Sequence, residues 1–393
     1  MRKISLLDRE NNAAILLAGI ITLIIGMGVS RFVFTSLLPF MLDDFLDLTF
    51  AAILASLNFA GYLSGSIFAI FIKDINTKIK YFRLGILLCI LTTFILATTT
   101  NESIWLISRI IAGFATAMTM VVGSAIIMIK LNLTDKTKAM GIYFSGIGFS
   151  ILVTDIISRI VHMSGGNWQD SWLVLTIFGL IISFYPLYIL SFNQNIKQTT
   201  IKHKISKSVF SPFVIILICA YFTEGVGFVV QGTFLPDIIN SLEGLNGYGS
   251  FTWLFVGIAG IPSCIICMRL AVKYGSINII IVAMTIQVIG ILIPTLSTNI
   301  FLNLLSGFLY GGTFVGLIAL FMNLGGKLAG KNPVLLMGAL TTAYGIGQVV
   351  APLYTVILTE YSGNYNYALY LTALIVFGGI LMLFFANNII KNK

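Results

Sequence analysis

The sequence is poor in charge, in histidine and in cysteine. Only 9% of its 393 residues are Asp, Glu, Lys or Arg, and it contains 2 histidines and 4 cysteines, whereas 58% of its residues are hydrophobic. Soluble globular domains are about 25% charged, so this composition lies outside their usual range. No acidic or histidine cluster has the spacing of a metal site, and there is no Walker phosphate-binding loop. These absences argue against an enzyme, a resident metal or cofactor, and a nucleotide-driven machine.

Long stretches of apolar residues recur along the whole chain. Because a helix needs about 20 apolar residues to cross the hydrocarbon layer, we predict an all-α polytopic membrane protein with twelve spans. The predicted spans are residues 13–41, 49–72, 82–98, 104–129, 139–161, 172–192, 210–236, 250–272, 277–296, 300–324, 333–358 and 367–386.

Charge is distributed asymmetrically between the connecting segments. Of the 23 Lys and Arg residues, Arg31, Arg109 and Arg159 lie inside spans, and the other twenty lie in segments on one side of the membrane or, for Arg83 and Arg269, within four residues of that side. The segments on the other side carry acidic residues only: Asp43, Asp44, Asp47, Glu102, Asp170, Asp237, Glu243 and Glu360. Because cytoplasmic loops retain positive charge, both termini are expected in the cytoplasm. The net charge of +9 therefore reflects topology and not nucleic-acid binding.

The four cysteines all lie inside predicted spans. Cys264 and Cys267 have the spacing of a redox or metal pair, but they lie in an apolar helix with no nearby histidine. Simple packing is the favoured interpretation.

The chain contains an internal repeat. Residues 28–39, at the end of the first span, align without gaps with residues 225–236, at the end of the seventh, at an offset of 197. Shorter segments of similar sequence relate the fourth span to the tenth and the fifth span to the eleventh. We predict two six-helix bundles, at 1–192 and 209–393, joined by a cytoplasmic linker at 193–208. Even span numbers make them parallel repeats with a cavity on the axis between them.

Several motifs resemble the major facilitator superfamily over nearly the whole chain. Arg109-Ile-Ile-Ala-Gly113 is similar to the R-x-x-x-G motif of that family, and Trp168 with Trp172 stands where the family often has an aromatic pair. The loop from Lys73 to Lys78 occupies the position of the family's signature loop, with only Asp74 and Lys78 matching it. The segment from Arg269 to Gly275 preserves the equivalent loop of the second half better.

The resemblance implies a transporter, with gating loops that contain Asp74, Lys78, Arg269 and Lys273. The end of the first span also resembles a poorly characterised bacterial branch of the superfamily, which implies the bacterial inner membrane. In this family the first and seventh spans line the central cavity on opposite sides.

Five charged residues lie within predicted spans and away from the Lys- and Arg-rich side of the membrane: Arg31, Arg109, Asp155, Arg159 and Glu224. A charge near the centre of a span costs about 2.5 to 3.5 kcal/mol on insertion scales, so it usually faces the protein interior or a wet cavity. Arg31 and Glu224 lie within a turn of the same depth on the first and seventh spans. We therefore expect them to face each other, and a role in binding or coupling is favoured over packing.

Arg109 and Asp155 also lie at similar depths, in the fourth and fifth spans. A tether between the two helices and a pair at the substrate site are both compatible with this placement. Arg159 follows Asp155 by four residues and shares its helix face, at ion-pair spacing. Because it lies near the end of its span, snorkelling to the headgroups is the favoured interpretation.

Uncharged polar residues in the spans are further candidates for substrate contacts, although each could equally join two helices. They are Asn58, Tyr62, Gln231, Asn303, Tyr310, Tyr344 and Gln348.

Taken together, these features predict a secondary active transporter that moves a small solute by alternating access. Without a nucleotide site, an ion gradient is the energy source, and Glu224 and Asp155 make protons the expected ion. Three buried arginines against two buried acids favour an anionic substrate. Efflux of hydrophobic or sugar-like compounds is an alternative, and a solute sensor without transport is a rival of another class. We expect a monomer.

Overall fold

The computed structural model describes residues 6–132, 136–191, 211–328 and 333–391, and all regular secondary structure in them is helical. The helices of the first half are α1 (Asn12–Leu23), η1 (Ile24–Phe32), α2 (Val33–Leu42), α3 (Leu48–Phe71), α4 (Ile75–Thr98), α5 (Glu102–Ala117), η2 (Met118–Val122), α6 (Gly123–Lys130), α7 (Lys136–Met163) and α8 (Trp168–Leu190). Those of the second half are α9 (Pro212–Asn240), α10 (Gly249–Tyr274), α11 (Ser276–Leu296), α12 (Ile300–Leu328), α13 (Pro333–Ser362) and α14 (Asn366–Lys391). The predicted linker 193–208 lies outside the described residues.

Twelve helical stretches are long and apolar enough to cross a membrane, which confirms the predicted number of spans. The largest difference is at the third span, which begins at Ile75 and not at residue 82. The side chain of Asp74 accepts a hydrogen bond from the backbone N–H of Thr77 at 2.9 Å and so caps the N-terminus of α4. Helix formation thus starts within the charged segment, before the apolar run that marked the span in the sequence.

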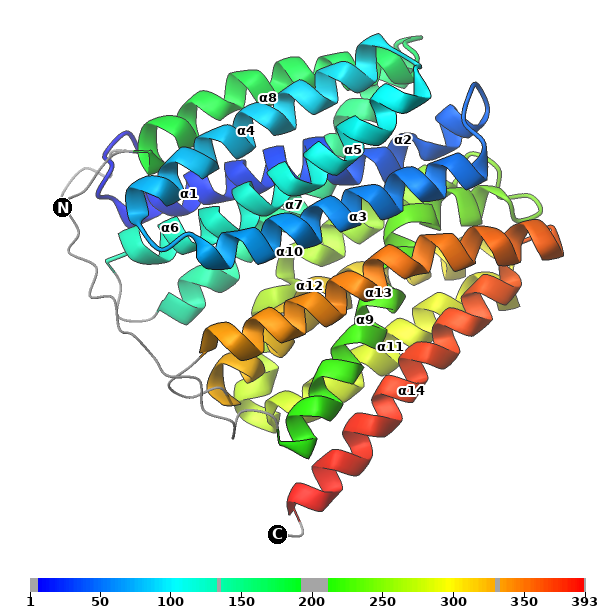
Figure 1. Cartoon of the computed structure of the whole chain (residues 1–393). Helices are drawn as coiled ribbons and strands as arrows, with labels where there is room; N and C mark the ends of the chain where they lie inside the picture. Colours follow the sequence, from blue (N-terminus) through cyan, green and yellow to red (C-terminus); the bar gives the residue numbers. More distant parts are fainter. Residues whose placement is uncertain (1–5, 133–135, 192–210, 329–332, 392–393) are drawn as a thin grey trace.

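The two halves lie side by side, with α1 to α8 in the upper part of Figure 1 and α9 to α14 in the lower part. Both ends of the chain lie at the same end of the molecule. Helices α7 and α10, and α3 and α13, pack across the boundary between halves. Glycines permit this close approach, since a Cβ added at Gly148 would lie 2.2 Å from the backbone nitrogen of Ile261, and one at Gly345 would lie 2.8 Å from Leu63.

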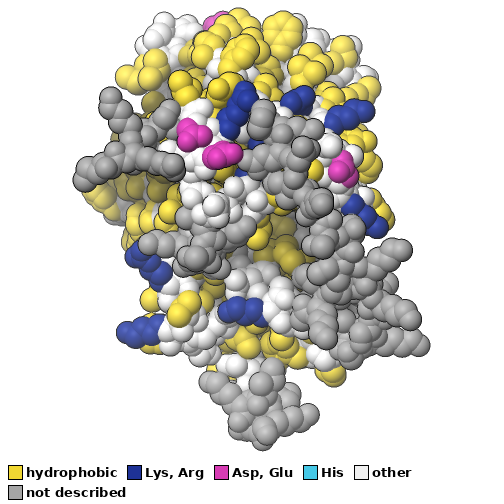
Figure 2. Space-filling view, turned by 90° about the vertical axis from the view of Figure 1, so that its left-hand side faces the viewer, with side chains coloured by type: hydrophobic (Ala, Val, Ile, Leu, Met, Phe, Trp, Pro, Cys, Tyr) yellow, Lys and Arg dark blue, Asp and Glu magenta, His cyan; other side chains and the backbone are white. Residues whose placement is uncertain are grey.

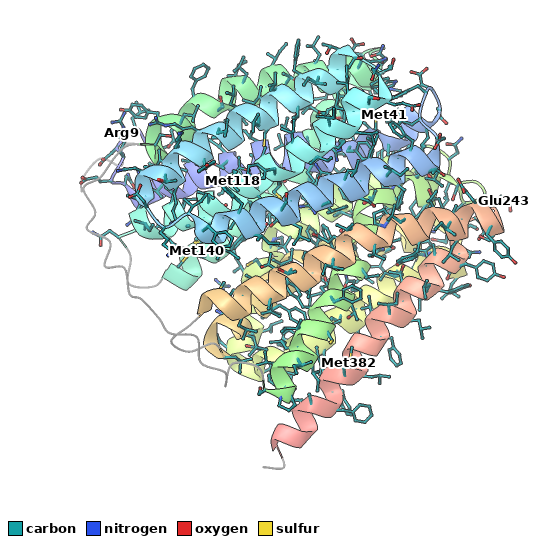
Figure 3. All side chains as sticks on the ribbon, in the orientation of Figure 1. Arg9, Met41, Met118, Met140, Glu243 and Met382 are labelled. Carbon is teal, nitrogen blue, oxygen red and sulfur yellow. The ribbon has the colours of Figure 1, made fainter. Side chains whose placement is uncertain are left out.

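The two ends of the molecule differ in charge, and the two halves are joined at one end but separated by a hollow at the other. Lys and Arg side chains are spread over the face near the termini, around a hollow whose floor is apolar (Figure 2). Arg9 lies at this end, whereas Glu243 lies at the opposite end (Figure 3). At that opposite end, the hydroxyl of Thr49 in the first half donates a hydrogen bond to the Glu360 carboxylate in the second half. The structure therefore joins the halves at the end away from the termini.

Candidate functional site

The first span does not remain α-helical along its length, because residues Ile24–Phe32 form a π-helix, η1. A second π-helical segment, η2 (Met118–Val122), lies in the fourth span. The two spans approach closely here: a Cβ added at Gly26 would lie 2.1 Å from the hydroxyl of Thr119, and Thr116 donates a 3.0 Å hydrogen bond to the Gly26 carbonyl oxygen. Because π-helical turns occur frequently at functional sites, the residues that η1 carries are candidates, and Arg31 is one of them.

A small cavity lies where η1 and α2 meet α3, α5 and α9. Its volume is about 10 Å³, close to the least that can hold one water molecule. The lining comes from both halves: Arg31, Phe32, Phe34, Thr35, Ala55, Asn58, Phe59, Arg109, Gly232 and Thr233. The cavity therefore lies at the boundary between the two bundles, and its wall combines polar and aromatic side chains.

Arg31 is buried, with 6% of its surface exposed, and is surrounded by aromatic rings. Its guanidinium carbon lies 4.4 Å from the ring centre of Phe59, 5.0 Å from that of Tyr62 and 5.7 Å from that of Phe228 in the other half. Such contacts partly compensate the buried charge. However, the Nε and Nη2 groups have no hydrogen-bond acceptor among the described residues. A guanidinium in this state is suited to binding a carboxylate or phosphate.

Arg109 lies on the same cavity and is 2% exposed. Its Nη1 group donates a 3.2 Å hydrogen bond to the Ser30 carbonyl oxygen, and its guanidinium carbon lies 4.6 Å from the Phe34 ring centre. The amide of Asn58 donates to the Arg109 carbonyl oxygen at 3.1 Å. The Nε group of Arg109 has no acceptor among the described residues. The cavity thus holds two guanidinium groups, and none of its lining residues is acidic.

Asp155 does not form the expected pair with Arg109. Instead, its carboxylate binds Arg159 on the same helix at 2.6 Å, and it accepts a 2.6 Å hydrogen bond from the hydroxyl of Ser36. The spacing of four residues on one helix brings these two charges together without any adjustment between helices. Similar depth did not determine which way Asp155 faces.

Arg159 makes contacts within the protein, and its snorkelling to the headgroups stays a prediction. Its side chain is 20% exposed, and its guanidinium carbon lies 4.5 Å from the ring centre of Phe251 on α10. Asp155 and Arg159 therefore connect α2, α7 and the second half. The role predicted for Asp155 in coupling stays a prediction.

Glu224 is fully buried in α9 but does not line the cavity that contains Arg31. Its Oε1 atom accepts a 3.3 Å hydrogen bond from the side-chain amide of Gln287 on α11, and its Oε2 atom has no partner among the described residues. The expected arrangement in which Glu224 faces Arg31 is therefore not formed here. Gln287 was missed by the sequence reasoning, although it is the one side-chain amide near the middle of its span.

The uncharged candidates mostly join helices in this conformation. Tyr310 donates to the Phe228 carbonyl oxygen at 2.9 Å, Asn303 to that of Ser297 at 2.8 Å, and Gln231 to the Ser306 hydroxyl at 3.3 Å. Tyr62 points its hydroxyl at the sulfur of Met120, 3.5 Å away. Tyr344 and Gln348 are buried with side-chain oxygens that lack partners among the described residues. Of these candidates only Asn58 lines the cavity, and contact of the others with a substrate stays a prediction.

The predicted gating residues lie at the end of the molecule near the termini. The backbone N–H of Thr77 lowers the pKa of the exposed Asp74 carboxyl by binding its charged form. Lys78 donates to the carbonyl oxygens of Ile72 and Lys73, so this loop is held by its own bonds. Arg269 and Lys273 are exposed on the last turns of α10. Their part in gating stays a prediction.

The comparisons with known proteins agree on the type of molecule. A family model described as "Uncharacterised MFS-type transporter YbfB" matches residues 23–383. Among solved structures, a point mutant of the nucleoside transporter NupG matches with a TM-score of 0.69 and 13% sequence identity, over 95% of this chain and 99% of that one. At this identity the likeness shows the fold alone. No curated protein matches the sequence.

Proposed function

The chain belongs to the MFS-type transporters of the YbfB family, and we propose that it moves a small anionic solute by alternating access, coupled to protons. It is a transporter and not an enzyme. The observation that carries the anionic substrate is Arg31, a buried guanidinium on a cavity between the halves, whose Nε and Nη2 groups lack acceptors among the described residues. Leaving a charged donor buried and unpaired is costly. A carboxylate or other anion on the substrate would remove that cost.

The arrangement of the halves supports alternating access around this cavity. They are joined by Thr49 and Glu360 at the end away from the termini, while the other face is hollowed (Figure 2). In the proposed cycle, the solute enters between the halves, draws the cavity residues of both halves around it, and leaves after the joined end has separated. The face near the termini is the cytoplasmic one in this proposal, since Lys and Arg residues gather there. The membrane is the bacterial inner membrane, and the working unit is a monomer.

Glu224 is the proposed proton carrier. It is fully buried, and among the described residues its one hydrogen bond is to the neutral amide of Gln287. A buried carboxyl with no cation beside it is more stable in the protonated form than in the ionised form. In the proposed cycle the proton leaves Glu224 when the rearrangement of α9 exposes this group to water.

The test uses purified protein in liposomes that contain a pH-sensitive dye, challenged with a panel of carboxylates, phosphates, nucleosides and sugars. We expect an added anion to drive both its own uptake and a proton flux. Arg31→Gln should weaken anion binding roughly tenfold to a hundredfold, the loss of one charge-assisted contact. Arg83→Gln is the matched control, because it removes the same charge from a residue that does not line the cavity. Equal loss in both variants would contradict the assignment.

The same panel distinguishes the alternatives. Transport of neutral sugars or apolar compounds that survives Arg31→Gln would favour efflux of such compounds over anion transport. Specific binding of a solute without any flux would favour a sensor.

A further inference from the structure

Two positive charges share the cavity, and no acidic side chain lines it. Arg31 and Arg109 are 6% and 2% exposed, and both contribute to its wall. In the described part of the chain, no acceptor lies within hydrogen-bond distance of Nε and Nη2 of Arg31 or of Nε of Arg109. Two like charges in a region of low dielectric repel each other strongly unless a counter-charge is present. One guanidinium group needs one negative charge as its partner, and this cavity contains two guanidinium groups.

The buried acidic groups in this part of the described chain are not available as counter-charges. Asp155 is held by Arg159 and by Ser36, each at 2.6 Å. Glu224 is hydrogen-bonded to Gln287, on a side of α9 that does not line the cavity. The protein therefore compensates the charge of Arg159 but leaves those of Arg31 and Arg109 without a carboxylate partner.

We infer that the solute is a small dianion, with Arg31 and Arg109 each binding one of its negative charges. This inference rests on the proposed function and specifies its substrate class. Two carboxylates on a short carbon chain, or a single phosphate monoester, would provide the charge. A carbon chain would lie against Phe34 and Phe59, which are apolar parts of the same wall. A monoanion would leave one guanidinium buried and unpaired, which is the costly state.

The contact between Arg109 and Ser30 suggests a competing role, in which Arg109 only holds η1 in place. That contact uses Nη1, however, and Nε remains without an acceptor on the cavity side. A purely structural arginine would be needed equally for every substrate. A ligand of the second charge is needed only for substrates that carry two, so the two roles predict different selectivity.

The first experiment uses the parent protein and a single carbon skeleton. Binding of succinate, monomethyl succinate and dimethyl succinate is measured by the shift in melting temperature in detergent, with methyl phosphate and glutarate as further arms. We expect succinate or methyl phosphate to bind at least about tenfold more tightly than monomethyl succinate, the factor for one charge-assisted contact. Preference for methyl phosphate identifies a phosphate monoester, and preference for succinate or glutarate identifies a dicarboxylate. Equal binding of succinate and its monomethyl ester would overturn the inference, although anion transport would still stand.

The second experiment uses Arg109→Gln and Arg109→Lys, with elution from size-exclusion chromatography as the check on folding. Arg109→Gln should lose most of the preference for the dianion, because its binding of succinate should fall far more than its binding of monomethyl succinate. Arg109→Lys keeps the charge and should retain part of the preference. Equal weakening of both ligands would show that Arg109 is structural and would overturn the inference. If no anion binds to the parent or depends on Arg31, it is the proposed function that fails.

Discussion

The hydroxyl of Thr35 donates a 2.6 Å hydrogen bond to the carbonyl oxygen of Gly232, and these positions are separated by 197 residues, the offset of the internal repeat. The bond therefore joins equivalent positions of the two halves across the axis that relates them. Both residues line the cavity that contains Arg31 and Arg109. Any movement that separates the first span from the seventh at this level has to break it.

We expect Thr35→Val to loosen the joined end of the transporter. Valine has nearly the shape of threonine but cannot donate, and the loss of one hydrogen bond is worth about 0.5 to 1.5 kcal/mol. Distances between spin labels placed at Asp43 and Glu243 should shift toward longer values, because the closed population falls. Thr35→Ser keeps the hydroxyl and serves as the control. An unchanged distance distribution in Thr35→Val would mean that other contacts hold the halves together.

The pair of Asp155 and Arg159 gives a prediction about stability. Asp155→Ala and Arg159→Ala each leave one charge without its partner, whereas the double variant leaves none. For buried pairs, removing one partner costs about 3 to 5 kcal/mol, and the double change costs less than the sum. Melting temperatures in detergent are measured for the parent, both single variants and the double variant, which together form a double-mutant cycle. The combination of Asp155→Ala with Arg109→Ala should be additive, since these residues are not paired. Strong coupling in this second cycle would contradict the observed geometry.

The contact between α3 and α5 is predicted to be intolerant of a single methyl group. A Cβ added at Gly113 would lie 1.9 Å from the carbonyl oxygen of Asn58, so the two helices would have to move apart. Overpacking of this kind costs about 1 to 3 kcal/mol. Gly113→Ala should therefore lower the melting temperature and, because Asn58 lines the cavity, weaken anion binding. Gly378→Ala in α14 is the control, since a Cβ there has nothing within 4 Å. Equal melting temperatures for the two variants would contradict the close approach.

The number of spans and the division of charge between loops followed from the sequence, because length and hydrophobicity alone decide whether a helix can cross a membrane. The same reasoning identified Arg31 and Arg109 as functional candidates, since charge within a span is costly whatever surrounds it. These properties depend on position along one helix.

The direction in which a side chain faces depends on the packing of all neighbouring helices, and here the sequence was insufficient. Asp155 faces Arg159 and Ser36, and Glu224 faces Gln287, although depth alone had suggested Arg109 and Arg31 as partners. The π-helical turns of η1 add to the difficulty, because they change the angular relation between residues on either side of them. Gly26 and Gly28 lie within this irregular segment.

Glu224→Gln tests the proposed coupling. Stability should be unchanged or improved, because a glutamine can share a hydrogen bond with Gln287 and brings no charge into the buried site. Anion binding should also persist, since Glu224 does not line the cavity. The expected loss is specific: the variant should exchange labelled anion across the membrane of liposomes but should not accumulate it against a gradient when a pH difference is imposed.

The matched control for this prediction is Gln287→Glu, which keeps the size of the side chain and places a second carboxyl beside Glu224. Two neighbouring carboxyls hold a proton more tightly than one, so accumulation should require a higher pH on the side to which the proton is released. If Glu224→Gln accumulates the anion as well as the parent does, the proton carrier lies elsewhere. Asp155 would then be the next residue to test, by Asp155→Asn, because it is the other fully buried carboxyl within the spans and contacts α2 through Ser36.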